Sequence, residues 1–184
     1  MKAIEFDSVA TVRIIFNAFR QRPAERLFAE ARRRDVGIIA RVPLASGLLT
    51  GKMGAASRFE ADDHRTFNRD GATFGRGGTF SGVDFERGLK AVDELRPLVP
   101  DGATMAQFAL RWILSHEAIG CAMPGANNPG QVTANAAASD LAPLSRRGAA
   151  RRARRLRATG QARRAPPVVN GYEPTMMPPF GCRV

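Results

Sequence analysis

The sequence predicts an α/β fold built on a parallel sheet. Apolar runs of strand length alternate along the chain with segments of helical spacing, and the first unit follows the order strand, helix, strand. The length agrees, because 184 residues with 44% hydrophobic content suffice for one ordinary domain with a real core. Most two-domain enzymes are longer, so we expect a single domain.

The first unit occupies the amino-terminal part of the chain. Residues 9–19 form a β-branched and aromatic run of strand length, and residues 22–35 carry apolar side chains on one face of a helix, with Pro23 suited to its first turn. Residues 36–44 are apolar except for Arg41, a pattern typical of a strand buried on both faces. Strand, helix and strand in succession predict a parallel pair.

The rest of the domain begins with a long irregular segment. Residues 53–82 contain six glycines, scattered aromatic side chains and no period, which predicts a long excursion on the surface. Helical spacing returns in residues 85–99 and 102–117, a short strand is predicted at 119–125, and a small-residue helix follows, ending near Asp140. The expected order is therefore β, α, β, long loop, α, α, β, α.

The strong positive charge is concentrated at the end of the chain. The formal charge is +11, but residues 1–144 hold 18 Lys and Arg against 16 Asp and Glu, whereas residues 145–184 hold 10 Arg against Glu173 alone. The basicity therefore belongs to the tail and does not mark the domain as a nucleic-acid binder.

Cysteine content and hydropathy indicate the compartment. Cys121 and Cys182 form neither a disulfide framework nor a metal-ligand spacing, as is usual in a reducing cytoplasm. No apolar run approaches the roughly 20 residues that span a bilayer, and Met1 is not followed by a signal-peptide core. We expect a soluble cytoplasmic protein with no membrane partner and no metal site.

Two loops are the candidate ligand sites, because ligands of parallel α/β sheets lie beyond the carboxyl ends of the strands. "ASGLLTGK" follows the second strand and "GANNPGQ" follows the third. In the second loop Asn127 and Asn128 precede Pro129 at a helix start, where free amide groups attract phosphate. The alternatives are an Asn-Pro helix cap that holds no ligand and a Lys52 side chain that is only solvated. Because both loops follow strands at the same end of one sheet, a ligand site is favoured.

Four stretches add a family resemblance. "GIIARVPLASGLLTGK", "ADDHRTFNRDG", "ATMAQFALRWIL" and "AMPGANNPGQVTANAAA" occur in this order. Over about residues 9–145 the sequence resembles the C-terminal part of the aldo-keto reductases, in the bacterial branch related to potassium-channel β-subunits. That family is a (β/α)8 TIM barrel that reduces carbonyls with NADPH. The resemblance implies that residues 1–144 are a partial barrel, its last three strands and NADP-binding half. It stops near Ser145, and residues 145–184 form an Arg/Pro-rich tail without core periodicity, which we expect to be disordered or out-of-frame.

The resemblance also implies a cofactor, NADP(H), and a small-molecule carbonyl substrate for the complete family enzyme. Residues of the first loop would wrap the pyrophosphate region, namely Pro43, Leu44, Ala45, Gly47, Thr50 and Lys52. Residues of the second would hold the adenosine end and its phosphate, namely Gly125, Ala126, Asn127, Gln131 and Asn135. Phe16 stands where the family commonly has an aromatic ring against the nicotinamide, and Arg13 stands where a glutamine often meets the nicotinamide amide.

No catalytic residue is assigned. Catalysis in the family uses a tyrosine tuned by a lysine, an aspartate and a histidine, all from the first half of the barrel, whereas the one tyrosine here is Tyr172, in the tail. We expect His64 to be solvated and His116 to end a helix whose dipole favours a cation. We therefore expect a fragment whose uncovered sheet needs a partner, such as a missing N-terminal half.

The tail suggests a second hypothesis. Permitted codons for residues 166–170, read one base later, encode His-Arg-Trp-stop, an ending common in this branch. We interpret the sequence after about Ser145 as an out-of-frame translation; the competing interpretation is a disordered basic arm for RNA or an acidic partner. A catalytically inactive nucleotide-sensing module and a basic nucleic-acid-binding protein remain the alternatives to a reductase, although we do not expect nucleic acid as a partner.

Overall fold

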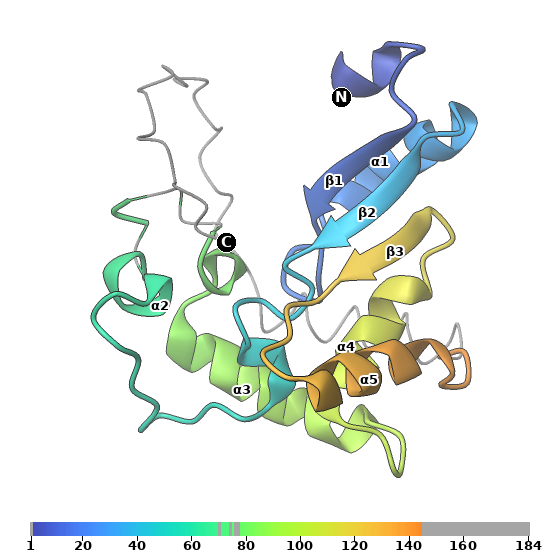
Figure 1. Cartoon of the computed structure of the whole chain (residues 1–184). Helices are drawn as coiled ribbons and strands as arrows, with labels where there is room; N and C mark the ends of the chain where they lie inside the picture. The colour runs from blue at the N-terminus through green and yellow to red at the C-terminus, as the bar shows by residue number, and fades with distance from the viewer. Residues whose placement is uncertain (1, 70, 74, 76–77, 145–184) are drawn as a thin grey trace, which may run out of the picture.

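The computed structural model describes residues 2–69, 71–73, 75 and 78–144 (Figure 1). Its centre is a three-stranded parallel sheet in which β2 (Gly37–Arg41) lies between β1 (Thr11–Ile15) and β3 (Ile119–Met123). The predicted α/β class and parallel pairing are thus confirmed. The expected tail, with its proposed frameshift, lies outside the described residues.

Four of the described helices follow in the predicted order and are shorter than their sequence patterns suggested, whereas another, His64–Phe67, lies in the excursion of residues 53–82, where no helix was predicted. The helices are α1 (Pro23–Arg33), α2 (His64–Phe67), α3 (Phe85–Leu95), α4 (Met105–Leu114) and α5 (Pro129–Ala136). Short 3₁₀ turns occur at Lys2–Glu5, Leu48–Thr50, Phe80–Gly82, Arg96–Leu98 and Ala137–Ser139. None of the helices in the described ranges is long and apolar enough to cross a membrane.

Side-chain caps determine where the later helices begin. Thr104 forms a capping box at the start of α4, since its Oγ1 accepts the backbone N–H of Gln107 at 3.2 Å and the Gln107 Oε1 accepts the backbone N–H of Thr104 at 2.9 Å. The side chains of Asp84 and Asn128 cap α3 and α5 in the same way, by accepting a backbone N–H of the first turn. These caps satisfy amide groups that a helix start leaves without intrahelical partners.

The hydrophobic core lies between the sheet and the helices. Ile38 and Ala40 of β2 are fully buried, and Phe16, just after β1, has no exposed surface. The Phe16 ring stacks on Trp112 of α4, with ring centroids 5.4 Å apart, and packs against Phe28 of α1 at 4.8 Å. Aromatic contacts of this kind join α1, β1 and α4 into one unit.

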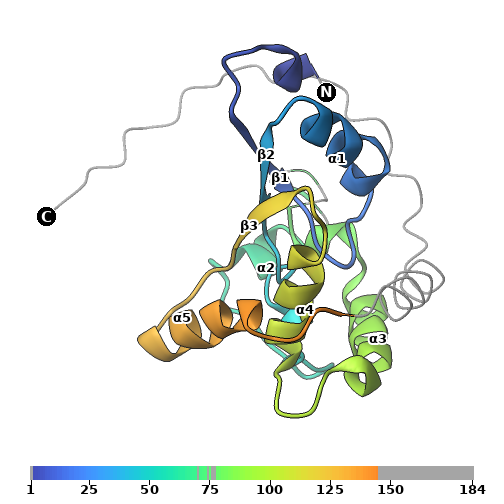
Figure 2. The ribbon, with the colours of Figure 1, turned by 90° about the vertical axis from the view of Figure 1, so that its right-hand side faces the viewer.

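The other face of the sheet is open, which corrects the expectation that residues 36–44 are buried on both faces. Ile39 is half-buried and Arg41 is exposed, whereas Ile38 and Ala40 are buried. Figures 1 and 2 place α1 and α2 on opposite sides of the sheet, and α2 does not pack onto it. Helices α1 and α4 both cover the face to which Phe16 points. Within the described part of the chain, no helix buries the second face.

Strand register defines this open face. Arg13 pairs with Ile39 and Ile15 pairs with Arg41, so these side chains share one side of the sheet. A register shift between Ile38 and Ile39 places Gly120 in excess on β3, after which Cys121 pairs with Ile39 and Met123 with Arg41. We call the set the open face; it consists of Arg13, Ile15, Ile39, Arg41, Cys121 and Met123.

The excursion of residues 53–82 is mostly irregular, as predicted, but its end is not a simple surface loop. Phe80 is 1% exposed, and Asn68 and Thr79 are buried with it. The Asn68 side chain is satisfied there, because its Nδ2 donates to Thr79 Oγ1 at 3.1 Å and its Oδ1 accepts the backbone N–H of Thr73 at 2.8 Å. Local hydrogen bonds of this kind allow polar residues to be buried.

Candidate functional site

Two loops leave the same edge of the sheet from neighbouring strands. Arg41, the last residue of β2, pairs with Met123, the last residue of β3. The loop of residues 42–52 therefore starts beside the loop of residues 124–128, at the carboxyl ends of the strands. Helix α4 contacts both the 3₁₀ turn in the first loop and α5 after the second. The structure thus brings the two predicted loops to one edge.

The first loop contains an unusual concentration of left-handed backbone. Val42, Ala45 and Ser46 have φ values of 52°, 48° and 56°, although none is a glycine. Gly47 and Gly51, with φ values of 90° and 70°, occupy the same region without this strain. Non-glycine residues in such conformations cost about 1–3 kcal/mol each and cluster at functional sites. The loop shape is therefore maintained against local preference.

The side chain of Asn17 makes hydrogen bonds that stabilise the shape of the first loop. This fully buried residue follows β1, and its Nδ2 donates to the carbonyl oxygen of Val42 at 2.8 Å and to Ser81 Oγ at 2.7 Å. Its Oδ1 accepts the backbone N–H groups of Phe19 and Arg20 at 3.0 and 3.1 Å. One side chain thus ties the end of β1, the first loop and the end of the excursion together.

A second tie joins the same segments. Ser46 Oγ accepts the backbone N–H of Phe80 at 3.2 Å, and Phe80 and Ser81 are themselves left-handed, with φ values of 46° and 59°. Sequence reasoning did not select Asn17, Ser46 or Ser81. An asparagine directly after an apolar strand was the available signal, because such a buried amide requires several partners.

Most of the first loop is held by its own hydrogen bonds. Thr50 Oγ1 donates to the carbonyl oxygen of Gly47 at 2.6 Å and accepts the backbone N–H of Lys52 at 3.3 Å, so the Thr50 hydroxyl shapes the turn. Arg96 Nη2 donates to the carbonyl oxygen of Gly51 at 2.9 Å, while its Nε pairs with Asp93 Oδ1 at 2.9 Å. This arginine was also not selected from the sequence, because its contact with Gly51 spans 45 residues.

Some donors of the first loop are left over. The backbone N–H groups of Leu44 and Ser46 make no hydrogen bond within the described residues. Lys52 is exposed and forms no ion pair with that part of the chain. Pro43 and Ala45 are buried, so they can meet a ligand only along the backbone. The donor set suits an anionic, oxygen-rich group.

The second loop presents its residues on the surface. Gly125, Ala126 and Asn127 are exposed, whereas Gln131 and Asn135 of α5 are partly covered. Gln131 Oε1 accepts the backbone N–H of Asn127 at 2.7 Å, and Asn135 Nδ2 donates to the carbonyl oxygen of Gly125 at 3.4 Å. These two side chains hold the loop against α5, a structural role that engages the Asn127 backbone N–H and leaves the Asn127 side chain exposed to solvent.

Gly125 has room around it. A Cβ at this position would meet no atom within 4 Å, and its φ does not lie in the left-handed region. The described protein therefore does not require a glycine there. An approaching ligand gives a reason for a glycine, since the backbone then presents no side chain to it.

The structure places Phe16 away from the open face. Side chains alternate along a strand, and Arg13 and Ile15 point to the open face, so Phe16 points to the helices. With no exposed surface, its ring contacts Trp112, Phe28 and His116 instead. This position does not fit the expected contact with a nicotinamide, and we leave Phe16 out of the site.

The two histidines do not join the loops. His116 packs its ring against Phe16 and Trp112, and its Nδ1 lies 3.1 Å from the carbonyl oxygen of Trp112. Burial lowers the pKa of His116, so the expected helix-end cation is wrong, because loss of hydration outweighs the pull of the nearby carbonyls. His64 begins α2 beside Asp63, with 3.4 Å between His64 Nδ1 and Asp63 Oδ1.

Other chemistry is not assembled in the described part of the chain. Among these residues no group of three or more His, Cys, Asp or Glu side chains could hold a metal ion. The one tyrosine of the sequence, Tyr172, lies outside them. The described residues instead form two neighbouring loops. The first, residues 42–52, is strained and presents hydrogen-bond donors, and the second, residues 124–128, is exposed and leads into α5.

Comparison with known proteins agrees with this arrangement. The model of the Aldo/keto reductase family matches residues 1–152. The chain belongs to that family. It is 32% identical over 126 residues to the aldo-keto reductase YhdN of Bacillus subtilis (strain 168), which covers 67% of this chain and 35% of the relative. It is 30% identical over 137 residues to a probable voltage-gated potassium channel subunit beta of Arabidopsis thaliana, covering 70% and 38%.

Solved structures of aldo-keto reductases share the fold. The glycerol dehydrogenase AKR11B4 from Gluconobacter oxydans matches with a TM-score of 0.67 and 27% identity, over 92% of this chain and 46% of that one. The holo form of the aldo-keto reductase AKR11C1 from Bacillus halodurans matches with a TM-score of 0.57 and 18% identity, over 88% and 46%. The chain thus spans less than half the length of these relatives.

Proposed function

We propose that this aldo/keto reductase family chain binds NADP(H) in its two carboxyl-end loops and serves the reduction of a carbonyl compound to an alcohol. The observation that carries the proposal is the strained loop of residues 42–52. Its three left-handed non-glycine residues stand at the sheet edge where α/β proteins bind nucleotides, together with the Leu44 and Ser46 N–H groups, which make no hydrogen bond to the described residues.

The residues present fit such a cofactor. The backbone N–H groups of Leu44 and Ser46 and the Lys52 ammonium would contact the pyrophosphate. Asn127 and the uncrowded backbone at Gly125 would meet the adenosine end, where the start of α5 adds its dipole. When bound, the reduced nicotinamide supplies the hydride.

The chain's own part in the reaction is to bind and orient. Asn17 holds the first loop at Val42, and Gln131 and Asn135 hold the second, so each loop keeps its shape before a ligand arrives. The proton donor for the carbonyl oxygen is not among these residues. We propose that the chain is the cofactor-binding part of a (β/α)8 barrel and that an N-terminal half covers the open face and supplies the acid.

Calorimetric titration of the full chain with NADP⁺ and with NAD⁺ tests the proposal. We expect NADP⁺ to bind, and Lys52→Ala to weaken it roughly tenfold, the loss of one charged contact of about 1.4 kcal/mol. Lys90→Ala is the matched control, because Lys90 is exposed on α3 and forms no ion pair in the described structure. No binding of either nucleotide, or equal effects of the two variants, would contradict the proposal.

A second candidate is a nucleotide-binding module without chemistry. It is favoured by Tyr172, the one tyrosine, which stands in the Arg-rich region after residue 144, and by His116, which is occupied in the core. Adding a separately expressed N-terminal half of a related reductase distinguishes the two. Turnover of NADPH in the mixture supports the reductase, and nucleotide binding without turnover supports the module.

A further inference from the structure

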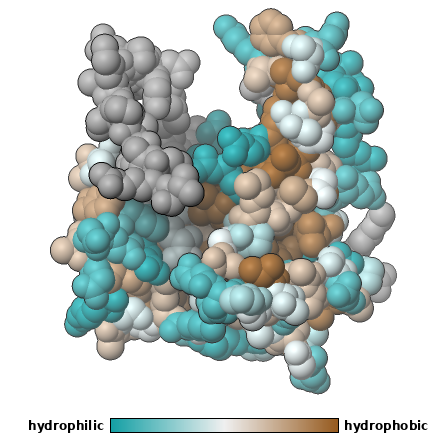
Figure 3. Space-filling model, viewed as in Figure 1, coloured by the Kyte–Doolittle hydropathy of each residue, from teal (hydrophilic) through white to brown (hydrophobic). Residues whose placement is uncertain are grey.

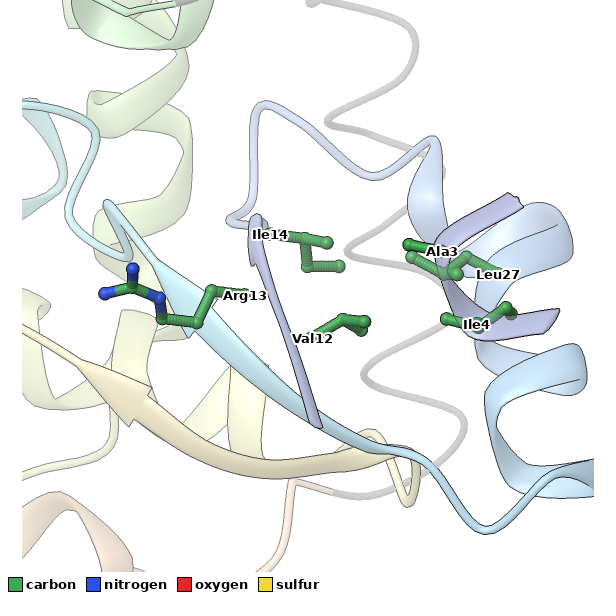
Figure 4. Close-up of a pocket in the computed structure, with 6 residues that line it drawn as sticks. All are labelled: Ala3, Ile4, Val12, Arg13, Ile14 and Leu27. Atoms are coloured by element: carbon green, nitrogen blue, oxygen red, sulfur yellow. The ribbon is translucent and has the colours of Figure 1, made fainter. Parts of the chain in front are cut away.

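The open face carries two arginines without counter-charges. Arg13 and Arg41 are both exposed, and neither forms an ion pair or a side-chain hydrogen bond within the described residues. In Figure 4 the Arg13 side chain lies on the other side of β1 from Val12 and Ile14, which point toward Ala3, Ile4 and Leu27. The Arg13 side chain therefore extends on the open face, although Arg13 is among the residues that line the apolar pocket.

Strand geometry places the two arginines near each other. Arg13 pairs with Ile39, and Arg41 lies two residues farther along β2 toward the carboxyl edge. With strands about 4.8 Å apart and a rise of about 3.3 Å per residue, their Cα atoms are roughly 8 Å apart on one face. Two long guanidinium side chains at this spacing can reach a single anion of several oxygens.

The remaining open-face residues make the surface suited to a small organic ligand. Ile15, Ile39, Cys121 and Met123 carry no charge, so the face holds two cations and no carboxylate. Figure 3 shows hydrophilic and hydrophobic residues next to one another along this side of the sheet. A ligand there would meet apolar side chains for its carbon skeleton and arginines for its charge.

We propose that Arg13 and Arg41 select a carbonyl substrate that carries an oxyanion group, a carboxylate or a phosphate. Arg41 ends β2 and directly precedes the strained loop, so a ligand held there lies next to the proposed cofactor site. Arginine matches carboxylate and phosphate oxygens with paired N–H donors. If a partner covered the face, two unpaired guanidinium groups would be costly, and an anionic substrate offsets that cost.

Matched ligand pairs test the proposal on the full chain. Titration followed by NMR of the arginine side-chain N–H groups would compare 2-oxobutyrate with 2-butanone, and dihydroxyacetone phosphate with dihydroxyacetone. We expect the charged member of at least one pair to bind and the neutral member not to bind; the pair that responds tells carboxylate from phosphate. Arg13→Gln and Arg41→Gln should each weaken binding about tenfold.

Controls separate this proposal from the cofactor proposal on which the substrate assignment rests. Arg26→Gln, an exposed arginine of α1 without an ion pair in the described structure, should leave both titrations unchanged. Circular dichroism verifies that each variant folds. Because the resemblance places Arg13 where a glutamine often meets the nicotinamide amide, the cofactor role is tested in Arg41→Gln, in which NADP⁺ affinity should survive. Its loss there would assign the arginines to the cofactor and overturn the substrate role.

Two further outcomes are distinct. If the chain binds the anions through Arg13 and Arg41 but no NADP⁺, the cofactor proposal fails while the oxyanion site stands. If NADP⁺ binds but neither anion does, or the charged and neutral members bind alike, the oxyanion site is refuted and the cofactor proposal stands.

Discussion

The side chain of Asn17 donates to the carbonyl oxygen of Val42, with 2.8 Å between the two atoms, and so links the end of β1 to the first residue of the loop after β2. Val42 is β-branched and has a φ of 52°, a left-handed conformation that is sterically unfavourable for such residues. The hydrogen bond offsets part of that strain. The shape of the candidate cofactor loop therefore depends on a residue 25 positions away in the sequence.

Replacing this amide should affect stability and binding together. Asn17→Ala leaves the Val42 carbonyl and Ser81 hydroxyl without their donor, so we expect the free energy of unfolding to fall by about 1–3 kcal/mol. NADP⁺ affinity should also fall, because the loop is released. Urea denaturation and calorimetry measure the two effects. Asn68→Ala is the control: it removes a similarly buried amide from the excursion, and unchanged nucleotide affinity is expected.

The helix behind the loop should not tolerate a larger residue at Gly88. A Cβ there would be too close to Cδ2 of Leu48, which is fully buried in the loop's 3₁₀ turn. Gly88→Ala should lower the free energy of unfolding by about 1–3 kcal/mol from overpacking, despite the better helix propensity of alanine. In a double-mutant cycle, adding Gly88→Ala to Leu48→Ala should cost less than adding it to the wild type. Strict additivity in urea denaturation would contradict the predicted contact.

The buried His116 ring predicts a pH dependence of stability. Because burial lowers the pKa of His116 in the folded protein from its ordinary 6.5, the unfolded chain binds a proton more readily. The stabilising effect of the neutral ring is fully present above pH 6.5 and is lost as the pH falls through the lowered pKa of His116 in the folded protein. Thermal unfolding from about pH 8 to about pH 5 measures this loss.

The matched histidine variants locate the effect. His116→Leu should flatten the dependence of the melting temperature on pH in the acid range, since its side chain does not titrate. His64→Gln should retain it, because His64 lies outside the aromatic cluster, at the start of α2. An equal flattening in both variants would show that His116 is not the group responsible.

The position of Phe16 gives a test of the nicotinamide contact. Phe16→Leu should reduce the free energy of unfolding by about 1–3 kcal/mol, because its contacts with Phe28 and Trp112 are lost. The ratio of NADPH to NADP⁺ affinity should stay constant, since a core residue does not touch the ring that changes charge. A changed ratio in paired titrations, at unchanged stability, would instead place Phe16 beside the nicotinamide.

Much of the fold was predictable because its signals are local. Apolar spacing in residues 22–35 and 102–117 located α1 and α4, and the Asn128-Pro129 pair marked the start of α5, since a cap and its helix are adjacent in the chain. The two candidate loops were found for a similar reason, because each directly follows an apolar strand. Their residues remain predictions until ligand binding is measured.

What the sequence could not show depends on contacts between distant segments. The pattern of residues 36–44 would be the same whether one or both faces were covered, and the arrangement of α1 and α4 decides that Ile38 is buried while Arg41 is exposed. Left-handed Ala45 and Ser46 have no signature of their own, because neither is a glycine.

The sequence alone thus settles the class of fold, the order of its elements apart from α2, and the family, since periodicity, caps and motifs are properties of neighbouring residues. Packing in three dimensions settles which side chains a ligand can reach. Packing buries Phe16 in the core, places Asn17 in hydrogen-bond contact with the first loop, and leaves Arg13 and Arg41 exposed on the open face. The physical reason is that burial and long-range hydrogen bonds depend on the whole fold.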